Sequence, residues 1–375
     1  MLRIAISLDL IGGYGREVLR GLMQYGNLVG NWEFLMPEMY SRERGPSIWD
    51  READGVVAMV HDEETIQAVK KWGGPVVNVA HTLEVKRLSE LGLASVLPDD
   101  AMVGRMAFDY FRDRGFRSFG FCGHPTVAWS RVREEAFVGA VGEAGFPVSV
   151  VRGADAVPHG WVKTLGRTVG LLAANDRYAW HAIDACRAGG IRVPEDLAVL
   201  GVDNDVLLDD LVRPSLSSIK PAAFQVGIEA GRLLTALMDG GTAPARAMVI
   251  PPEGFVTRNS TDVLTLEDEA VVSAVRFIRL NADKPISVED VQRDVMISRR
   301  NLERRFKLVL GRSLLQEIRR VRIERACDLL RDTDFDMQLI AERCGFQSQI
   351  RFSTVFGQVR GVSPSGYRKK HRATR

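Results

Sequence analysis

The spacing of apolar residues changes once along this 375-residue chain, near residue 260. Before that point, short β-rich runs alternate with stretches of helical spacing, whereas beyond it the spacing is helical only. Repeated strand–helix units predict parallel sheets with helices on both faces. More than six such units precede residue 260, too many for one small doubly wound domain. We therefore expect an α/β domain of two lobes, followed by an all-α domain.

The expected elements follow from these patterns. The predicted strands are Arg3–Leu8, Gly55–Val60, Val76–Ala80, Ser118–Cys122, Val169–Ala174, Leu197–Val202 and Ala247–Ile250. The predicted helices between them are Arg16–Tyr25, Glu63–Trp72, Asp100–Arg114, Arg133–Ala144, Tyr178–Ala188 and Ala222–Met238. A polar, acidic stretch at Ser260–Glu269 separates the two parts. We place the first domain at 1–262, a linker at 263–270 and the helical domain at 271–375.

Charge is distributed unequally between the two parts. Residues 271–375 carry 23 Lys and Arg against 12 Asp and Glu, about +11, and residues 1–270 carry 27 against 36, about −9. Such a split indicates a nucleic-acid-binding module attached to an acidic partner domain. A solvated basic surface without a ligand is the alternative that charge alone leaves open.

The first helix pair of the helical part has the pattern of a helix-turn-helix unit. Ser287 can cap the first helix with Asp290 three residues on, and Ser298 can cap the second. An apolar stripe at Leu302, Phe306 and Val309 predicts the buried face of the second helix. The opposite face presents side chains that can reach base edges or phosphates from the major groove: Arg299, Arg300, Glu303, Arg304 and Lys307.

A second unit of the same kind begins near Asp336. Gly345 suits the positive φ of a tight turn between its two helices. The helix after the turn has an apolar face of Phe352, Val355, Phe356 and Val359. The outward side chains, which we expect to contact DNA, are Gln349, Ile350, Arg351, Ser353 and Thr354. The long arginine-rich helix at Ser313–Arg331 is suited to fix the two reading helices about one DNA turn apart.

These C-terminal residues resemble the DNA-binding domain of the arabinose-regulator (AraC) family. The resemblance is carried by Ile340-Ala341, Cys344-Gly345-Phe346, Phe352-Ser353, Val355-Phe356, Gly361-Val362-Ser363-Pro364 and Tyr367-Arg368. It implies double-stranded DNA as a partner. It also implies base-reading positions at Arg300, Glu303 and Arg304 in the first unit and at Gln349, Ile350, Ser353 and Thr354 in the second. Arg351 stands where the family usually has an aromatic residue.

The first domain resembles the lactose-repressor (LacI) and periplasmic sugar-binding superfamily. The matching residues are Asp99-Asp100, Arg131-Val132-Arg133 with Phe137, Asn175-Asp176, Gly201-Val202-Asp203-Asn204 and Arg258-Asn259-Ser260-Thr261. The resemblance implies a ligand cleft between the lobes. The open ends of parallel strands are also where such folds bind ligands.

Side chains of the first domain have the chemistry of a polyol site. A carboxylate such as Asp203 can accept from neighbouring sugar hydroxyls, while Arg133 donates to sugar oxygens. Aromatic planes for the sugar are offered by Trp129, Trp161 and Tyr14. Asp99 and Asp176 are further ligand candidates, although both could instead be helix N-caps, and Trp161 could belong to the core. The glycines of Gly12–Gly15 do not have the spacing of a dinucleotide loop.

A sugar-binding domain of the LacI type joined to a DNA-binding domain of the AraC type resembles regulators of sugar-utilisation genes. The resemblance implies a sugar effector with D-xylose as the leading candidate, a homodimer, activation rather than repression, and contact with RNA polymerase. Two alternatives stay open here. One is a sugar-modifying enzyme with a DNA-binding tail, and the other is a structural protein that packages DNA.

Other sequence features restrict the function further. The cysteines, Cys122, Cys186, Cys327 and Cys344, lack zinc-like spacing, and we expect buried thiols in a reducing compartment. Met1 is followed by no cleavable leader and no apolar run long enough to span a membrane, so we expect a cytoplasmic protein. We find no nucleophile elbow, HExxH, phosphate loop or histidine cluster. We therefore expect neither catalysis nor a cofactor or metal.

Overall fold

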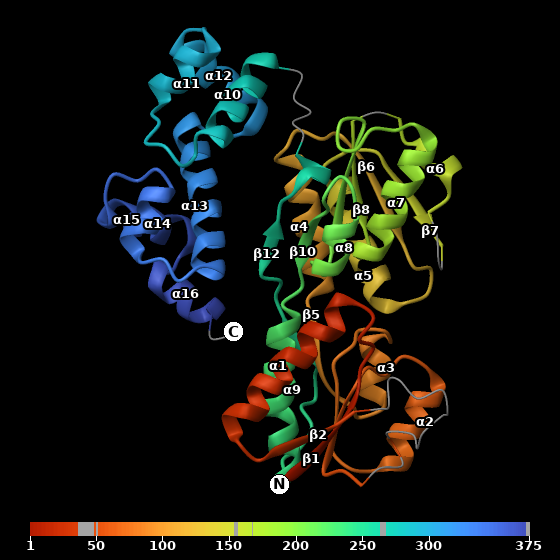
Figure 1. The fold of residues 1–375 in the computed structure, drawn as a ribbon. Coiled ribbons are helices and arrows are strands. Elements are labelled where there is room, and N and C mark those ends of the chain that lie inside the picture. Colours follow the sequence, from red (N-terminus) through yellow and green to blue (C-terminus); the bar gives the residue numbers. More distant parts are fainter. Residues whose placement is uncertain (37–48, 50–51, 154–156, 167, 263–267, 373–375) are drawn as a thin grey trace. The chain divides into compact units, whose positions relative to one another are not determined.

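The computed structural model describes residues 1–36, 49, 52–153, 157–166, 168–262 and 268–372. The chain divides into two compact units, one of Met1–Arg112 with Phe116–Val263 and one of Asp113–Gly115 with Leu264–Arg375. The first unit holds two α/β lobes, and the second is helical (Figure 1). The predicted fold class is therefore confirmed.

Lobe 1 is built on a parallel sheet with the strand order β11-β5-β4-β3-β1-β2. Its strands are β1 (Leu2–Ser7), β2 (Trp32–Leu35), β3 (Gly55–Ala58), β4 (Val76–Asn78), β5 (Ala94–Pro98) and β11 (Met248–Ile250). Its helices are α1 (Gly13–Val29), α2 (Glu63–Trp72), α3 (Val85–Glu90) and α9 (Ala223–Met238). The central strands β3, β4 and β5 are buried along their whole length, as expected of a sheet covered on both faces.

Lobe 2 repeats this architecture with the strand order β12-β10-β9-β8-β6-β7. Its strands are β6 (Ser118–Gly123), β7 (Val148–Arg152), β8 (Val169–Ala173), β9 (Leu197–Val202), β10 (Ser217–Lys220) and β12 (Gly254–Val256). Its helices are α4 (Asp100–Arg112), α5 (Ala128–Glu143), α6 (His159–Thr164), α7 (Asp176–Gly189) and α8 (Val206–Leu211). All strand pairs are parallel except β10 with the edge strand β12.

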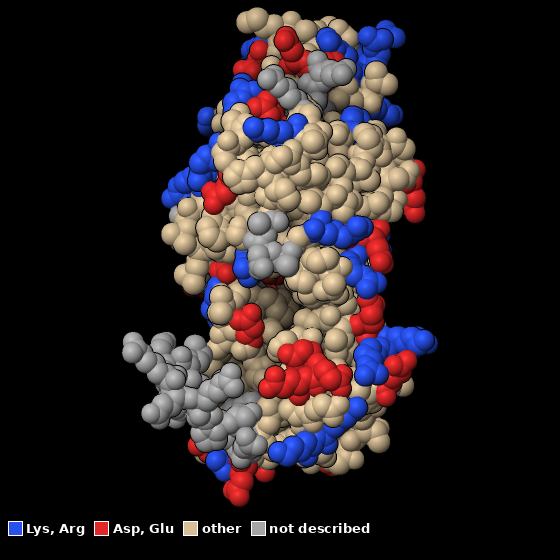
Figure 2. Space-filling model, turned by 90° about the vertical axis from the view of Figure 1, so that its right-hand side faces the viewer, with Lys and Arg blue, Asp and Glu red and all other residues tan. Residues whose placement is uncertain are grey.

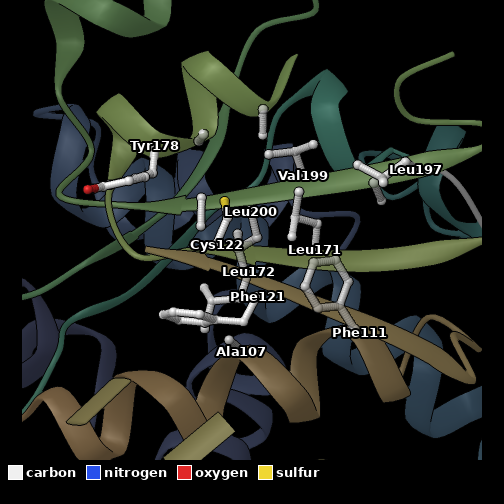
Figure 3. Packing of buried hydrophobic residues seen from close by; sticks show 14 of the residues in the cluster. Ala107, Phe111, Phe121, Cys122, Leu171, Leu172, Tyr178, Leu197, Val199 and Leu200 are labelled. Atoms are coloured by element: carbon white, nitrogen blue, oxygen red, sulfur yellow. The ribbon is translucent and has the colours of Figure 1, made fainter. Parts of the chain in front are cut away.

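The core of lobe 2 fills both sides of its sheet. Ala107 and Phe111 of α4 pack against one face, and Tyr178 of α7 lies on the other (Figure 3). Successive residues Leu171 and Leu172 of β8 point to opposite faces and are both fully buried. This rigid sheet fixes the positions of the loops that follow its strands.

The chain crosses between the lobes three times, from β5 to α4, from β10 to α9 and from β11 to β12. Each lobe therefore contains segments that are distant in sequence. The loops after β1, β3 and β4 of lobe 1 and after β8 and β9 of lobe 2 contribute to one cavity.

The helical unit consists of α10 (Glu269–Leu280), α11 (Val288–Val295), α12 (Arg299–Leu310), α13 (Leu314–Asp332), α14 (Met337–Arg343), α15 (Gln349–Arg360) and α16 (Pro364–Arg372). It has two cores. Leu302 and Phe306 of α12 lie in the first, and Phe352 and Phe356 of α15 lie in the second. Helix α13 contributes to both, with Ile318 in the first and other residues in the second, and so connects the two helix-turn-helix pairs.

The caps and the linker show where local prediction holds. Ser287 and Asp290 form the predicted capping box of α11, whereas Ser298 occupies the N-cap of α12 without a side-chain hydrogen bond. Ser260 is fully buried in a short 3₁₀ helix and donates to the Val199 carbonyl at 2.6 Å, so the start of the polar stretch packs into lobe 2. Most of the predicted linker, residues 263–267, lies outside the described residues.

Candidate functional site

A cavity of about 490 Å³ lies between the two lobes of the first unit. The surface of this unit is hollowed between its lobes (Figure 2). The lining residues from lobe 1 are Ser7, Leu8, Asp9, Gly12, Tyr14, Gly15, Met59, His61, Ala80, His81, Thr82 and Pro98. Those from lobe 2 are Trp129, Arg133, Asn175 and Asp203. Most follow the carboxyl ends of parallel strands, where open α/β sheets bind ligands.

Arg133 of α5 is the central donor of this cleft. Only 3% of the residue is exposed. Its Nε donates to Asp100 Oδ1 at 2.7 Å and its Nη1 to the Ala174 carbonyl at 2.6 Å. Burial acts to lower the pKa of Arg133, but the carboxylates of Asp100 and Asp203 raise it above its ordinary value. The guanidinium therefore stays charged and is held in one orientation.

Asp100 connects Arg133 to a histidine of the other lobe. Its Oδ2 lies 2.7 Å from His81 Nδ1, and its side chain is fully buried. When Nδ1 carries the proton, it donates to this carboxylate. The other ring nitrogen, Nε2, is then available to a ligand in the cleft. The buried Asp100 carboxylate thus orients two side chains that line the cavity, Arg133 and His81.

Two aromatic rings give the cleft its apolar surface. The Arg133 guanidinium lies 5.0 Å from the centre of the Trp129 ring, a cation–π contact. Tyr14 Oη donates to the Val79 carbonyl at 2.7 Å, and burial raises the pKa of Tyr14 well above its ordinary value. The Tyr14 hydroxyl is therefore neutral and occupied, so this residue offers its ring to a ligand.

Asp203 is the partly buried acidic group of the cleft, whereas the other lining carboxylate, Asp9, is exposed. Burial raises the pKa of Asp203 to about 7, Arg133 acts to lower it, and the carboxylates of Asp100 and Asp205 raise it further. Its backbone has φ +110°, a conformation that side-chain-bearing residues rarely adopt. No described residue makes a hydrogen bond to its carboxylate, which is consistent with a group held ready for a ligand.

Asp99 and Asp176 lie outside this lining. Asp99 Oδ1 accepts from the Met102 amide at 2.8 Å at the start of α4. Asp176 accepts from the Asp205 amide at 2.8 Å and from Ser218 Oγ at 2.7 Å, so it supports the loop that carries Asp203. The structure brings together Asp203, Arg133, Trp129 and Tyr14 but not these two carboxylates. Trp161 also lies apart, with its indole bonded to Ser149 Oγ.

Several cleft residues escape the sequence prediction. His81 and Asn175 line the cavity, and Asn175 also caps α7 by accepting from the Tyr178 amide. Their positions in the sequence could have identified them, because each lies within a few residues of the carboxyl end of a buried strand. Gly15 packs so closely that a Cβ there would lie 1.8 Å from the Asp9 carbonyl oxygen. Gly13 and Gly15 therefore permit close packing of this segment, whereas a Cβ at Gly12 would meet no neighbour within 4 Å.

An ion pair joins the lobes beside the cleft. Arg16 Nη2 of α1 lies 2.5 Å from Asp205 Oδ1, whose side chain is 6% exposed. Arg16 also donates to the carbonyls of Leu10 (3.0 Å) and Ile11 in the loop after β1. One guanidinium thus couples the position of this loop to the lobe that carries Asp203.

The helical unit places the predicted DNA-contacting residues on two exposed helix faces. On α12, Arg299, Arg300, Arg304 and Lys307 are exposed and Glu303 is partly buried. On α15, the exposed residues are Gln349, Ile350, Arg351 and Thr354, and Ser353 is partly buried. The α12 face is strongly basic, whereas the α15 face carries a single positive charge.

Among the described residues, no helix is long and apolar enough to cross a membrane, and no cluster of potential metal ligands occurs.

Comparison with known proteins agrees with this architecture. A periplasmic binding protein-like domain matches residues 108–261, and a helix-turn-helix domain matches residues 292–370. The xylose operon regulatory protein of Escherichia coli (strain K12) is 32% identical over 98% of this chain and 96% of its own length. The protein of the same name from Haemophilus influenzae is 29% identical over 98% of each chain. A solved structure of a xylose-binding transcription activator has 30% identity and a TM-score of 0.62 over 98% of each chain.

The fold, the cleft and the paired helix-turn-helix units define a sugar-responsive, DNA-binding transcription regulator and not an enzyme. The identity with the Escherichia coli protein extends over nearly the whole length of both chains. The chain belongs to the family of xylose operon regulatory proteins.

Proposed function

We propose that this regulator binds D-xylose or a closely related pentose in the cleft between its lobes, and that the bound sugar changes how its helical domain engages DNA. The observation that carries the proposal is the arrangement of Arg133 and Asp203. A fixed donor and an unoccupied carboxylate, with the rings of Trp129 and Tyr14, provide the contacts that a small polyol needs.

The charges of the cleft favour a neutral ligand. The charge of Arg133 is balanced by Asp100, and Asp203 adds a further carboxylate. A sugar phosphate or a sugar acid would bring negative charge to a site without a spare cation at Arg133. A free sugar brings only hydroxyl donors and acceptors. The cavity of about 490 Å³ is within the usual range for small-molecule sites.

The choice of D-xylose rests on the names of the relatives, which are xylose operon regulatory proteins and a xylose-binding transcription activator. We propose activation for the same reason. We also propose that the protein is cytoplasmic and forms a homodimer. A dimer places reading helices on two half-sites of DNA. There the bound protein can contact RNA polymerase.

The proposed switch is closure of the lobes around the sugar. Asp203 follows β9 of lobe 2, whereas Tyr14 and His81 belong to lobe 1, so a ligand that contacts all three bridges the lobes. A sugar that binds the closed state more tightly shifts the population toward it. An ordinary coupling of about 1–3 kcal/mol changes DNA affinity about 5–150-fold. On this proposal, Arg299, Arg300, Glu303, Arg304 and Lys307 of α12 and Gln349, Ile350, Arg351, Ser353 and Thr354 of α15 contact the DNA.

A calorimetric titration with D-xylose, L-arabinose, D-ribose and D-glucose tests the ligand. We expect D-xylose to bind most tightly and Asp203→Ala to weaken its binding by more than about tenfold, because buried hydroxyls lose their acceptor. Asp99→Ala is the matched control, since this nearby carboxylate caps α4 outside the cavity lining. Failure of every sugar to bind, or equal binding by Asp203→Ala, contradicts the proposal.

A further inference from the structure

A second cavity, of about 330 Å³, lies within the helical unit, between the two helix-turn-helix pairs. Its walls come from the start of α11 and α12 on one side and from the α14–α15 turn and α15 on the other, with α13 between them. We call it the arginine groove, after its four lining arginines Arg299, Arg319, Arg322 and Arg351. It shares no lining residue with the sugar cleft, and two of its arginines, Arg319 and Arg322 of α13, lie outside the proposed DNA contacts of α12 and α15.

The arginine groove carries uncompensated positive charge. Its single acidic lining residue, Glu289, forms an ion pair with Arg299. Within the described part of the chain, no carboxylate forms an ion pair with Arg319, Arg322 or Arg351. Three of the four groove arginines therefore lack a paired carboxylate among the described residues, and the groove has the electrostatics of a binding site for an anion.

Arg322 shows that these charges oppose one another. Its Nη2 donates to the carbonyls of Lys284 (2.6 Å) and Ile286 (3.1 Å), and its guanidinium lies 5.6 Å from the centre of the Phe346 ring. Burial lowers the pKa of Arg322, and the nearby Arg351 guanidinium lowers it further. The buried Nε has no hydrogen-bond partner among the described residues. An anion between these side chains would relieve the repulsion.

The two walls of the groove are held at a fixed separation. Gly345, in the turn before α15, has φ +68°, and a Cβ there would lie 2.2 Å from the Lys284 carbonyl oxygen. Only glycine permits this close approach of the two pairs. Together with the carbonyl contacts of Arg322, this packing fixes where α12 and α15 begin relative to each other.

The groove also lies between the starts of the two proposed reading helices. Arg299 is the first residue of α12, and Arg351 is in the first turn of α15. Two helices that enter successive stretches of the major groove have a sugar-phosphate strand running between their starting points. We infer that the arginine groove holds a phosphodiester of that strand, with Arg319 and Arg351 as its principal donors. This inference rests on the proposed DNA contacts of α12 and α15.

The salt dependence of DNA binding tests this inference. Each phosphate neutralised contributes about 0.9 to the slope of log affinity against log salt concentration. We expect the double variant Arg319→Ala with Arg351→Ala to reduce the slope by about that amount on sheared genomic DNA without sugar, and each single variant to reduce it by part of that amount. Arg319→Lys should retain the wild-type slope. Arg276→Ala, which removes an exposed arginine of α10 outside the groove, is the control and should leave the slope unchanged.

The possible outcomes separate this inference from the proposed function. Equal slopes for the wild type, Arg319→Ala and Arg351→Ala overturn the phosphodiester assignment, whether or not sugar affects DNA binding. Stabilisation by inorganic phosphate that Arg319→Ala abolishes, together with equal DNA slopes, also overturns it and assigns the groove to a free anion. Loss of slope in both groove variants, with normal sugar affinity in each, supports it.

Discussion

The cleft between the lobes and the proposed DNA-reading surface, the exposed faces of α12 and α15, use arginines in opposite settings. Arg133 of the cleft is 3% exposed and bonded to a fully buried carboxylate. Arg300 of α12 is exposed, and its guanidinium forms no ion pair with the described residues. In the cleft, the protein has already desolvated and oriented its charges, whereas on the reading surface they stay hydrated until DNA arrives.

Because of this contrast, a substitution in the cleft and a substitution on the exposed helix faces affect different properties of the protein. Removing one member of a buried pair leaves the other without compensation, so the folded state itself is destabilised. Removing an exposed charge leaves the folded state almost unchanged and weakens only the complex with DNA. Stability should therefore respond to changes in the cleft, and salt-dependent DNA affinity to changes on the reading surface.

The largest expected effect is that of Arg133→Met. The buried Asp100 carboxylate loses its charged partner, so we expect the free energy of unfolding to fall by about 3–5 kcal/mol. Urea denaturation measures it. Arg131→Met is the matched control on the same helix, because its ion pair with Glu84 (3.2 Å) is exposed and should be worth less than about 1 kcal/mol.

A double variant, Arg133→Met with Asp100→Asn, sharpens the same comparison. It removes both charges, so we expect it to recover part of the stability that Arg133→Met loses. Equal destabilisation by Arg133→Met and Arg131→Met would show that the buried setting of Arg133 has no energetic consequence.

The next expected effect concerns pH. The pKa of Asp203 is raised to about 7, so between its ordinary pKa and pH 7 the folded protein binds a proton that the unfolded chain has lost. The free energy of unfolding should therefore decrease as pH rises from about 4 to 7, with a contribution of at most about 1.4 kcal/mol per pH unit from this group. Asp203→Asn should remove that contribution, and Asp99→Asn should not. Identical pH profiles for the wild type and Asp203→Asn contradict the prediction.

The fold could be predicted because burial leaves a strong pattern in the sequence. The predicted strands Gly55–Val60 and Val76–Ala80 extend two residues beyond β3 and β4, because Val60 and Ala80 remain buried after the strand hydrogen bonds have ended. Several short elements of three to six residues went unpredicted, because segments of this length give little periodicity: the strands β2, β5, β7, β10 and β12 and the helices α3, α6 and α8.

The site could be predicted only in part, because its geometry depends on contacts between distant segments. Arg133 and Asp203 are recognisable because their local segments, Arg131-Val132-Arg133 and Gly201-Val202-Asp203-Asn204, resemble those of the LacI and periplasmic sugar-binding superfamily. His81 acquires its role through Asp100, 19 residues further on, and Asp176 proves to be a support only when Ser218 and the Asp205 amide are seen beside it. Nothing local in the sequence distinguishes a carboxylate that binds a ligand from one that supports a loop.

The smallest effect on the folded protein is expected at Arg300. Because its side chain is exposed, Arg300→Ala should change the free energy of unfolding by less than about 0.5 kcal/mol. If this side chain reads a base edge, the same change costs about 1–3 kcal/mol of affinity for the preferred DNA sequence and relaxes selection at one base pair. In vitro selection of DNA sequences with the wild type and the variant measures both. An equal loss on all sequences would instead assign Arg300 to the phosphate backbone, and the exposed arginine would then contribute affinity for DNA without sequence specificity.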